Sequence, residues 1–417
     1  MKAWTSAIRF WRGYLIAALA TVASTSHAAA PSVTDIPGTP TGITSNVKTI
    51  ISFRNQVHSW QTADGAVHLM VNQGTQGAEV GLALYSSFDG GSTWIHEFTV
   101  PDTIDATEDG ELTSSTSSGA TLQFVYNTVK GGATIRLGTA TYDVATQSWS
   151  LGDIQTAYSQ SGMVPSIPAF TIDDQGNYWC AFTVANRKQQ TDEELLIYLA
   201  AGSSQWQQTG VVFGTPDDST EHSARPLPFA GGVAALYQDD TTLYWAYRLD
   251  GAPFTAPWTT VVLATDLPPE SADPYGTHYS VVADADDNLY LAYVTSAADL
   301  IYTSYTSSTA TWQPSQQLAG SSTISVYPEV TLSGGSVVLF VNDKSDVSAY
   351  QSTDGGETFT LTQTLKHPPI VSGSGISYGQ PRVESPRYAT SPVPVWEQFI
   401  DSPPGYGLLF FQVPVVE

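Results

Sequence analysis

The sequence predicts an all-β fold, a β-propeller of seven blades, from its composition, from a recurring aromatic residue, and from strand-forming segments at its two ends. The 417 residues are rich in Thr, Ser, Tyr, Trp, Val and Gly, and no long stretch carries apolar residues at helical spacing. An aromatic residue opens a short extended segment after a polar turn, at intervals of roughly fifty residues. Six positions carry it: Trp94, Trp149, Trp206, Trp258, Trp312 and Phe359.

Two further strand-forming segments precede each of these aromatic residues in a fixed order. The first is continuously or alternately apolar, as expected of a strand buried within a small sheet, and occurs at 66–71, 120–126, 177–182, 232–237, 288–293 and 336–341. The second occurs at 81–87, 135–142, 195–202, 243–249, 300–306 and 347–353. With one more extended segment before the first, each unit reads as four antiparallel strands joined by hairpins.

The two ends of the chain predict how the ring closes. Only three strand-forming segments remain at the C-terminus, at 381–385, 392–399 and 407–414, whereas residues 49–53 near the N-terminus form an isolated one. Pairing this N-terminal strand with the last three would complete a seventh four-stranded blade and remove free sheet edges. Six or eight blades remain alternatives, because the boundaries near 100–120 and 365–380 are the least clear.

The first thirty residues predict an export signal. Lys2, Arg9 and Arg12 supply its positive end, residues 14–22 its short apolar core, and residues 28–30 a small-residue cleavage site. We expect residues 1–30 to be the signal peptide, 31–44 a linker, and 45–417 a single propeller domain. The apolar core is too short to span a membrane, so we expect a protein that is secreted, to the extracellular space or the periplasm, and that is not bound to a membrane. We also expect a monomer.

The net charge and the cysteine content limit the classes of partner and bound group that we expect. The formal charge is −24, and removal of the three basic signal residues takes it to −27. A protein this acidic repels nucleic acid and anionic membrane surfaces. The single cysteine, Cys180, lies in an apolar segment and cannot form an internal disulfide. No metal-binding Cys/His pattern and no phosphate-binding glycine loop occur, so we predict neither a metal nor a cofactor.

Two of the polar turns share a specific pattern. Residues 87–94 match Ser-x-Asp-x-Gly-x-Thr-Trp at every specified position, and residues 352–359 match it with Phe in place of Trp. The Asp carboxylate can accept hydrogen bonds from its own turn, the glycine allows positive φ, and the aromatic ring packs beneath the hairpin. We therefore predict structural roles for Ser87, Asp89, Gly91, Trp94, Ser352, Asp354, Gly356 and Phe359.

These turns are Asp-boxes, and through them the chain resembles the sialidase-like (BNR/Asp-box) propeller superfamily. That superfamily includes sialidases, other glycoside hydrolases, some polysaccharide lyases and fucose-binding lectins. The resemblance implies boxes on the outer side of the ring, away from the active centre. Sialidases also have an Arg-Ile-Pro motif, three arginines, a Tyr–Glu pair and an Asp acid. Arg54 could correspond to the motif's arginine, with Arg225 and Arg382 beside it, but Ile-Pro and a Tyr–Glu spacing are missing, which leaves exo-sialidase activity as an alternative only.

A central site is predicted from residues that the repeat places at the axis. Aligning the units without gaps puts Gln56, Glu111, Ile167, His222, His278 and Ser325 at one equivalent position. From this position and its neighbours we select candidate catalytic residues: His222, His278, Glu221, Tyr279 and Tyr327. Candidate substrate-binding residues are Arg54, His58, Glu111, Arg225 and Arg382.

This residue set suits an extracellular, acidic glycan in two ways. In β-elimination, an arginine neutralises the uronate carboxylate while His or Tyr moves the protons. In hydrolysis, two carboxyl groups flank the glycosidic oxygen, with Glu221 and Glu111 as candidates. The leading hypothesis is therefore a glycoside hydrolase or polysaccharide lyase. The alternative is a propeller that binds glycan, as lectins do, or protein without catalysis; the residues at the axis differ from blade to blade, which favours one central site.

Overall fold

Strands make up nearly all the regular structure of the protein. The computed structural model describes residues 33–416 apart from 49, 52, 54, 75–80, 104–105, 129–132, 187–190, 218–223, 270–277, 321–326, 343–345, 371–375, 379–381 and 402–404. The described residues contain no α-helix and one 3₁₀ turn, η1 (Ser307–Thr309). The all-β prediction is confirmed at this level. The predicted signal peptide, residues 1–30, lies outside the described residues.

Most strands belong to antiparallel sheets of four, in which chain order is also spatial order. The first three sheets are β3 (Ser59–Gln61), β4 (Val67–Asn72), β5 (Leu82–Ser87) and β6 (Ile95–Thr99); β7 (Glu108–Thr116), β8 (Gly119–Thr128), β9 (Thr134–Asp143) and β10 (Ser148–Ser159); and β11 (Met163–Ile172), β12 (Tyr178–Asn186), β13 (Thr191–Leu199) and β14 (Gln207–Asp217). The next two are β15 (Ala224–Phe229), β16 (Gly232–Asp239), β17 (Thr242–Leu249) and β18 (Thr259–Thr265); and β19 (Tyr279–Ala283), β20 (Leu289–Val294) and β21 (Asp299–Thr306) with β22 (Thr311–Trp312) and β23 (Gln316–Gly320).

Two more sheets include strands from both ends of the described chain. One joins β24 (Pro328–Ser333), β25 (Ser336–Asn342), β26 (Val347–Ser352) and β27 (Thr360–Lys366) with β1 (Thr34–Pro37) and β29 (Tyr388–Ala389). The other has the order β2 (Thr39–Ser45), β31 (Gly405–Val413), β30 (Val393–Asp401) and β28 (Val383–Glu384). The predicted apolar segments coincide with the second and third strands of the repeated sheets, and the recurring aromatic residue lies at or just before the outermost strand.

The N-terminal strand that joins the last sheet is β2, not residues 49–53. β2 pairs antiparallel with β31, with Thr39 opposite Phe410 and Ser45 opposite Tyr406. The prediction of a linker at 31–44 and of a closing strand at 49–53 is therefore wrong, because β1 and β2 occupy the former segment. Pro40 and Gly42 indicated a linker, but proline is tolerated at a sheet edge and the glycine lies in a β-bulge.

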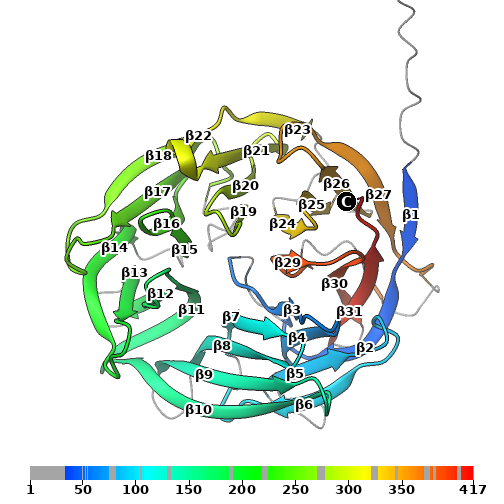
Figure 1. Ribbon diagram of the computed structural model, residues 1–417, viewed down its shortest axis with the longest axis horizontal. Coiled ribbons are helices and arrows are strands. Elements are labelled where there is room, and N and C mark those ends of the chain that lie inside the picture. The colour runs from blue at the N-terminus through cyan, green and yellow to red at the C-terminus, as the bar shows by residue number, and fades with distance from the viewer. Residues whose placement is uncertain are drawn as a thin grey trace, which may run out of the picture. The chain divides into compact units, whose positions relative to one another are not determined.

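The first strands of neighbouring sheets meet around a common centre (Figure 1). Contacts link β7 to β11, β11 to β15, β15 to β19, β19 to β24 and β24 to β28, and β29 contacts β3. Between β3 and β7, the Gly110 amide donates to the Val57 carbonyl, 3.1 Å apart. Residues widely separated in sequence therefore converge where these strands begin, and the side chains between adjacent sheets form apolar clusters.

The turns at 87–94 and 352–359 hold themselves together as their chemistry predicts. Asp89 accepts hydrogen bonds from the Thr93 amide and hydroxyl and from the Ser87 hydroxyl. Asp354 accepts the equivalent bonds from Thr358 and Ser352. Hydrogen bonds to the ionised form lower the pKa of Asp354 to about 2.

Each of these two turns also packs on the neighbouring sheet. Gly91 has φ +83° and touches the Phe410 ring so closely that a Cβ would lie 2.0 Å from it. The Trp94 ring packs edge-on against Phe410 at 5.4 Å, and Phe359 packs in the same way on Tyr302 at 4.7 Å. Both turns therefore serve to pack one sheet on the next.

Candidate functional site

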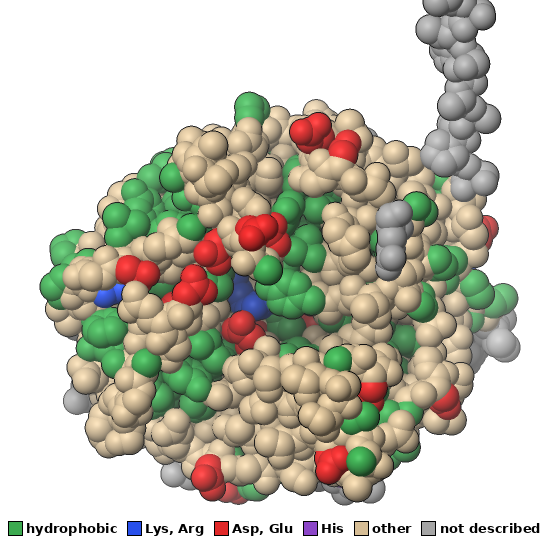
Figure 2. All heavy atoms as spheres, viewed as in Figure 1, with side chains coloured by type: hydrophobic (Ala, Val, Ile, Leu, Met, Phe, Trp, Pro, Cys, Tyr) green, Lys and Arg blue, Asp and Glu red, His purple; other side chains and the backbone are tan. Residues whose placement is uncertain are grey.

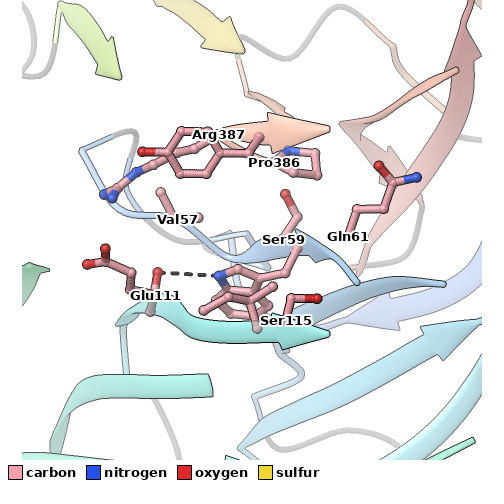
Figure 3. A pocket seen from close by; sticks show the side chains of 11 residues that line it. Val57, Ser59, Gln61, Glu111, Ser115, Pro386 and Arg387 are labelled. Carbon is pink, nitrogen blue, oxygen red and sulfur yellow. Dashed lines mark hydrogen bonds between the residues drawn. The ribbon is translucent and has the colours of Figure 1, made fainter. Parts of the chain in front are cut away.

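A cavity of about 200 Å³ lies where β3, β7 and the 386–388 segment come together. Figure 3 shows Arg387 and Pro386 on one side and Glu111 and Ser115 on the other, with Ser59 between. Figure 2 shows that one face of the molecule is hollowed at its centre, with basic side chains in the hollow and acidic side chains around it. Concave, largely apolar sites with a few polar groups of this kind are typical of ligand-binding pockets.

Glu111 is the titratable carboxyl group of this cavity. It follows Asp109 on β7, is half-buried, and accepts a hydrogen bond of 3.4 Å from the Thr171 hydroxyl. Burial raises the pKa of Glu111 to about 7; the Arg225 guanidinium opposes the rise and the Asp109 carboxylate adds to it. At neutral pH this carboxyl group can both give and take a proton, as general acid–base catalysis requires.

Arg387 and Tyr388 face Glu111 from the other side of the cavity. The backbone of Arg387 is fixed by a 2.8 Å hydrogen bond from the Leu332 amide to its carbonyl. Its Nη2 atom is buried and has no hydrogen-bond partner among the described residues. Tyr388 is 53% exposed, and its hydroxyl donates to the Ala283 carbonyl at 2.8 Å. The segment thus presents an unpaired cationic donor and an aromatic ring.

A buried ion pair between Arg225 and Asp109 lies next to the site. The Arg225 Nη1 atom lies 2.7 Å from Asp109 Oδ2, and both side chains are almost fully buried. Arg225 also donates to the carbonyls of Asn55 and Phe170, and Asp109 accepts from the Val57 amide. These contacts connect four sheets, through their first strands or through the segments that directly precede those strands. The predicted substrate-binding residue Arg225 therefore lies at the centre, with its charge already paired.

A smaller chamber of about 20 Å³ lies beside the cavity and shares Val57 and Arg387 with it. Glu329, the second residue of β24, lines this chamber and accepts a 3.3 Å hydrogen bond from the Ser280 hydroxyl. Burial and then the nearby Glu384 carboxylate raise the pKa of Glu329 well above its ordinary value. Asn55 also lines the chamber, and neither atom of its buried side-chain amide has a hydrogen-bond partner among the described residues.

His58 is paired with a carboxylate and lines neither cavity. Its Nδ1 atom lies 3.1 Å from Glu384 Oε2, and Glu384 Oε1 accepts from the His58 amide and the Ser59 hydroxyl. Burial alone would lower the pKa of His58, but the Glu384 carboxylate outweighs it and the pKa is raised. The structure thus places the predicted substrate-binding residue His58 as a buried partner of Glu384.

Three more predicted residues lie close to the centre but do not offer a free polar group to the cavity. Tyr279 is 1% exposed, and its hydroxyl donates to the Leu236 carbonyl at 2.8 Å. His278 is buried with its ring stacked on Tyr327, the centroids 5.8 Å apart. Arg382 donates to the Ile51 carbonyl at 2.9 Å and lies over the Phe53 ring. Arg54, Glu221 and His222 fall outside the described residues.

Asn55, Glu329, Arg387 and Tyr388 were missed by sequence reasoning, although one signal could have found Glu329. Four charged residues occupy the second position of the first strand of a sheet: Asp109, Arg225, Glu329 and Glu384. A polar residue at the start of an otherwise apolar strand is this signal. Arg387 and Tyr388 carry no equivalent, because they lie in an irregular segment that the repeat does not contain.

Acidic side chains of two hairpin turns stand near the mouth. Burial, together with the carboxylates of Asp174, Asp284 and Asp286, raises the pKa of Asp287. The Tyr388 phenol interacts electrostatically with Glu111, Asp284 and Asp287 as well as with Arg225.

In the part of the chain that the structure describes, no group of His, Cys, Asp and Glu is arranged to hold a metal ion, and no helix is long and apolar enough to cross a membrane.

Comparisons with known proteins find similar folds and no relative in sequence. No family model matches the chain, and no curated protein matches it. Among solved structures it is similar to the polysaccharide lyase Uly1, with 11% identity, a TM-score of 0.46, and coverage of 88% of this chain and 91% of that one. It is also similar to the SapL1 lectin in complex with α-methyl fucoside, with 13% identity, a TM-score of 0.42, and coverage of 77% and 99%.

A Trypanosoma rangeli sialidase is similar too, with 11% identity and a TM-score of 0.44. The match covers 73% of this chain and 54% of the sialidase, so the chain spans about half the length of that protein.

Proposed function

We propose that the protein is a carbohydrate-active enzyme that cleaves a glycosidic bond beside an acidic sugar, by hydrolysis or elimination, in the central cavity. One observation carries this proposal. The Glu111 carboxyl group and the Arg387 guanidinium line the same cavity, and neither forms an ion pair with a described residue. A substrate bound between them would meet a proton-transfer group on one side and a cation on the other.

Each of these residues has a role that its surroundings support. Glu111, with a pKa of about 7, exchanges a proton with the substrate. Arg387 binds the sugar carboxylate, because an unpaired guanidinium nitrogen offers a charge-assisted hydrogen bond to an anionic oxygen. Tyr388 packs its exposed ring on a sugar face. The site then holds one ring of a glycan with its charged group turned inward.

The remaining expectations belong to the same proposal. We propose a seven-bladed propeller closed by β2 in the last blade; its support is the pairing of β2 with β31 and the seven sheets among the described residues. We also propose that residues 1–30 are a signal peptide, and that the protein works as a secreted monomer on an extracellular glycan. The turns at 87–94 and 352–359 act in folding, away from the site.

The test is a screen of uronate-containing polysaccharides with wild-type protein and the Glu111→Gln variant. Formation of unsaturated product is monitored by absorbance, and reducing ends are measured separately, so that elimination and hydrolysis are distinguished. We expect Glu111→Gln to lower kcat by about 10²–10⁴-fold with little change in KM, because a general acid–base group contributes about that much. Glu357→Gln, an exposed change in the outer turn, is the matched control and keeps full activity.

Glycan binding without cleavage is the second candidate, and the exposed Tyr388 ring favours it. Aromatic rings at the mouth of a pocket are suited to sugar stacking whether or not a reaction follows. Retention on a glycan array with no product in either assay would support this function and reject the enzyme. Loss of retention in a Tyr388→Ala variant would then locate the binding surface.

A further inference from the structure

The small chamber beside the main cavity holds a second carboxyl group, Glu329, in surroundings unlike those of Glu111. The chamber and the cavity share Val57 and Arg387, so a group in the chamber is adjacent to a ligand in the cavity. Glu329 accepts one hydrogen bond, from Ser280, and forms no ion pair with a described residue. Its nearest carboxylate, Glu384, is already bonded to His58 and Ser59.

Electrostatics keeps Glu329 neutral. A buried carboxyl group that forms no ion pair favours its protonated form, since ionisation would leave a charge without a direct partner in a low-dielectric site. The Arg225 guanidinium, which lines the same chamber, opposes this effect without outweighing it. Burial and the Glu384 carboxylate accordingly raise its pKa far above the ordinary value. Glu111, in contrast, ionises near neutral pH. Two carboxyl groups whose environments separate their pKa values in this way form an acid–base pair.

The chamber also has the size and the polar groups to hold one water molecule. Its volume is about 20 Å³, and a water needs roughly 10–15 Å³ of such space together with two to four polar partners. The side-chain amide of Asn55 offers one donor group and one acceptor, and Arg387 Nη2, which carries two N–H groups, offers one of them here and keeps the other for the sugar carboxylate; all three atoms are buried and have no hydrogen-bond partner among the described residues. A water there would satisfy these atoms.

Resting on the proposed function, we propose that Glu329 is the proton source of the cleavage reaction and delivers its proton through one water molecule held by Asn55 and Arg387. As the C–O bond of the substrate breaks, its electron pair stays on the leaving oxygen, which takes a proton from the water, and the water takes the proton of Glu329. Glu111 accepts the second proton, from the attacking water in hydrolysis or from the sugar carbon in elimination. Exchange with solvent restores both groups.

The test uses Glu329→Gln, because a glutamine has the shape of a protonated glutamate but cannot give up a proton. Two substrates are compared: the oligosaccharide found by the polysaccharide screen, and an aryl analogue in which para-nitrophenol is the leaving group, attached at C1 of the sugar for hydrolysis or at C4 of the uronate for elimination, so that its departure needs no protonation. We expect kcat on the oligosaccharide to fall about 10²–10⁴-fold while kcat on the aryl analogue stays within about threefold. Asn55→Leu should show the same substrate dependence with a smaller loss. Glu397→Gln, a buried change bonded to Asn342 and His367, should leave both rates unchanged.

A second measurement detects the protonation state of Glu329 and does not depend on catalytic activity. In the infrared spectrum at neutral pH, the Glu111→Gln variant should show a protonated-carboxyl band that a further Glu329→Gln change removes; the Glu111→Gln background is used because Glu111, with a pKa of about 7, would contribute a band of its own. Absence of the Glu329 band, or equal loss of kcat on both substrates, overturns the inference. If wild-type protein releases no product, the proposed function fails and this inference with it. If wild-type protein is active and Glu111→Gln is not, while Glu329→Gln cleaves the oligosaccharide normally, only the inference fails.

Discussion

The ion pair between Asp109 and Arg225 gives the sharpest test of how this fold is held together. The change is Asp109→Asn, which keeps the shape of the side chain and removes its charge. Asp109 is 0% exposed and Arg225 3% exposed, so the substitution leaves a guanidinium buried at the centre without its counter-charge. Removing one partner of a buried pair destabilises proteins by about 3–5 kcal/mol. The variant also turns an amide donor toward the backbone amide of Val57 or that of Phe170.

Urea unfolding followed by tryptophan fluorescence measures this loss as a fall in the free energy of unfolding. The matched control is Asp346→Asn, whose partner Lys366 has a side chain 41% exposed; exposed ion pairs contribute less than about 1 kcal/mol. Replacing both buried partners by apolar residues, as in Asp109→Leu with Arg225→Met, should recover part of the stability, since no charge is then buried. If Asp109→Asn lowers the free energy of unfolding no more than Asp346→Asn does, the buried pair does not stabilise the contacts between the first strands.

Two other predictions follow from titratable groups. His68 accepts a hydrogen bond from the Trp149 indole at Nδ1, and burial lowers its pKa to about 3; unfolded protein therefore binds a proton between pH 6.5 and 3 that folded protein does not. The contribution of His68 to stability should therefore be constant above pH 6.5 and fall below it by up to about 1.4 kcal/mol per pH unit down to about pH 3. It is measured as the difference in urea melts between wild-type protein and His68→Gln, because Glu111, Glu329 and His58, whose pKa values are raised, contribute slopes of the opposite sign. Asp287→Asn should raise kcat/KM for an anionic glycan about twofold at low salt, because a charge about 10 Å away in water contributes about 0.4 kcal/mol, and the gain should vanish at high salt. A lower rate in Asp287→Asn would show instead that the rim attracts a cationic group.

The strands were predictable because the repeat places apolar residues at fixed distances from one aromatic residue. Phe124 and Trp179, both fully buried, lie inside segments that were assigned as strands from the sequence. β2 was not predictable in this way, since Pro40 and Gly42 look like a linker and only the partner strand β31 reveals the edge. Periodicity identifies buried strands well and edge strands poorly.

The candidate site was predictable only where the alignment without gaps held. It selected Glu111, which lines the cavity, but Ile167 lies in a β-bulge with φ +49°, and one extra residue of this kind shifts every later position in a blade. The alignment placed Gln56 at the axis position, but its amide is bonded to the backbone of Pro168 and Phe53, while the amide without a hydrogen-bond partner among the described residues belongs to its neighbour Asn55. Arg387 could not be predicted from the repeat, because it lies in the irregular segment before β29, and the position of that segment depends on the pairing of β29 with β24.

The centre of the fold assigns different chemistry to carboxyl groups that the sequence cannot tell apart. Asp109 has Arg225 as its counter-charge and Glu384 has His58, and both pairs are buried. Glu329 forms no ion pair with a described residue, and burial and the Glu384 carboxylate raise its pKa well above the ordinary value although the Arg225 guanidinium opposes the rise. Glu111, at the cavity, has a pKa of about 7. Burial and pairing together, rather than residue type, therefore decide which carboxyl group supports the fold and which can move a proton. The two carboxyl groups that form no ion pair with a described residue, Glu111 and Glu329, also line the adjoining cavities, which is why the proposed reaction uses them.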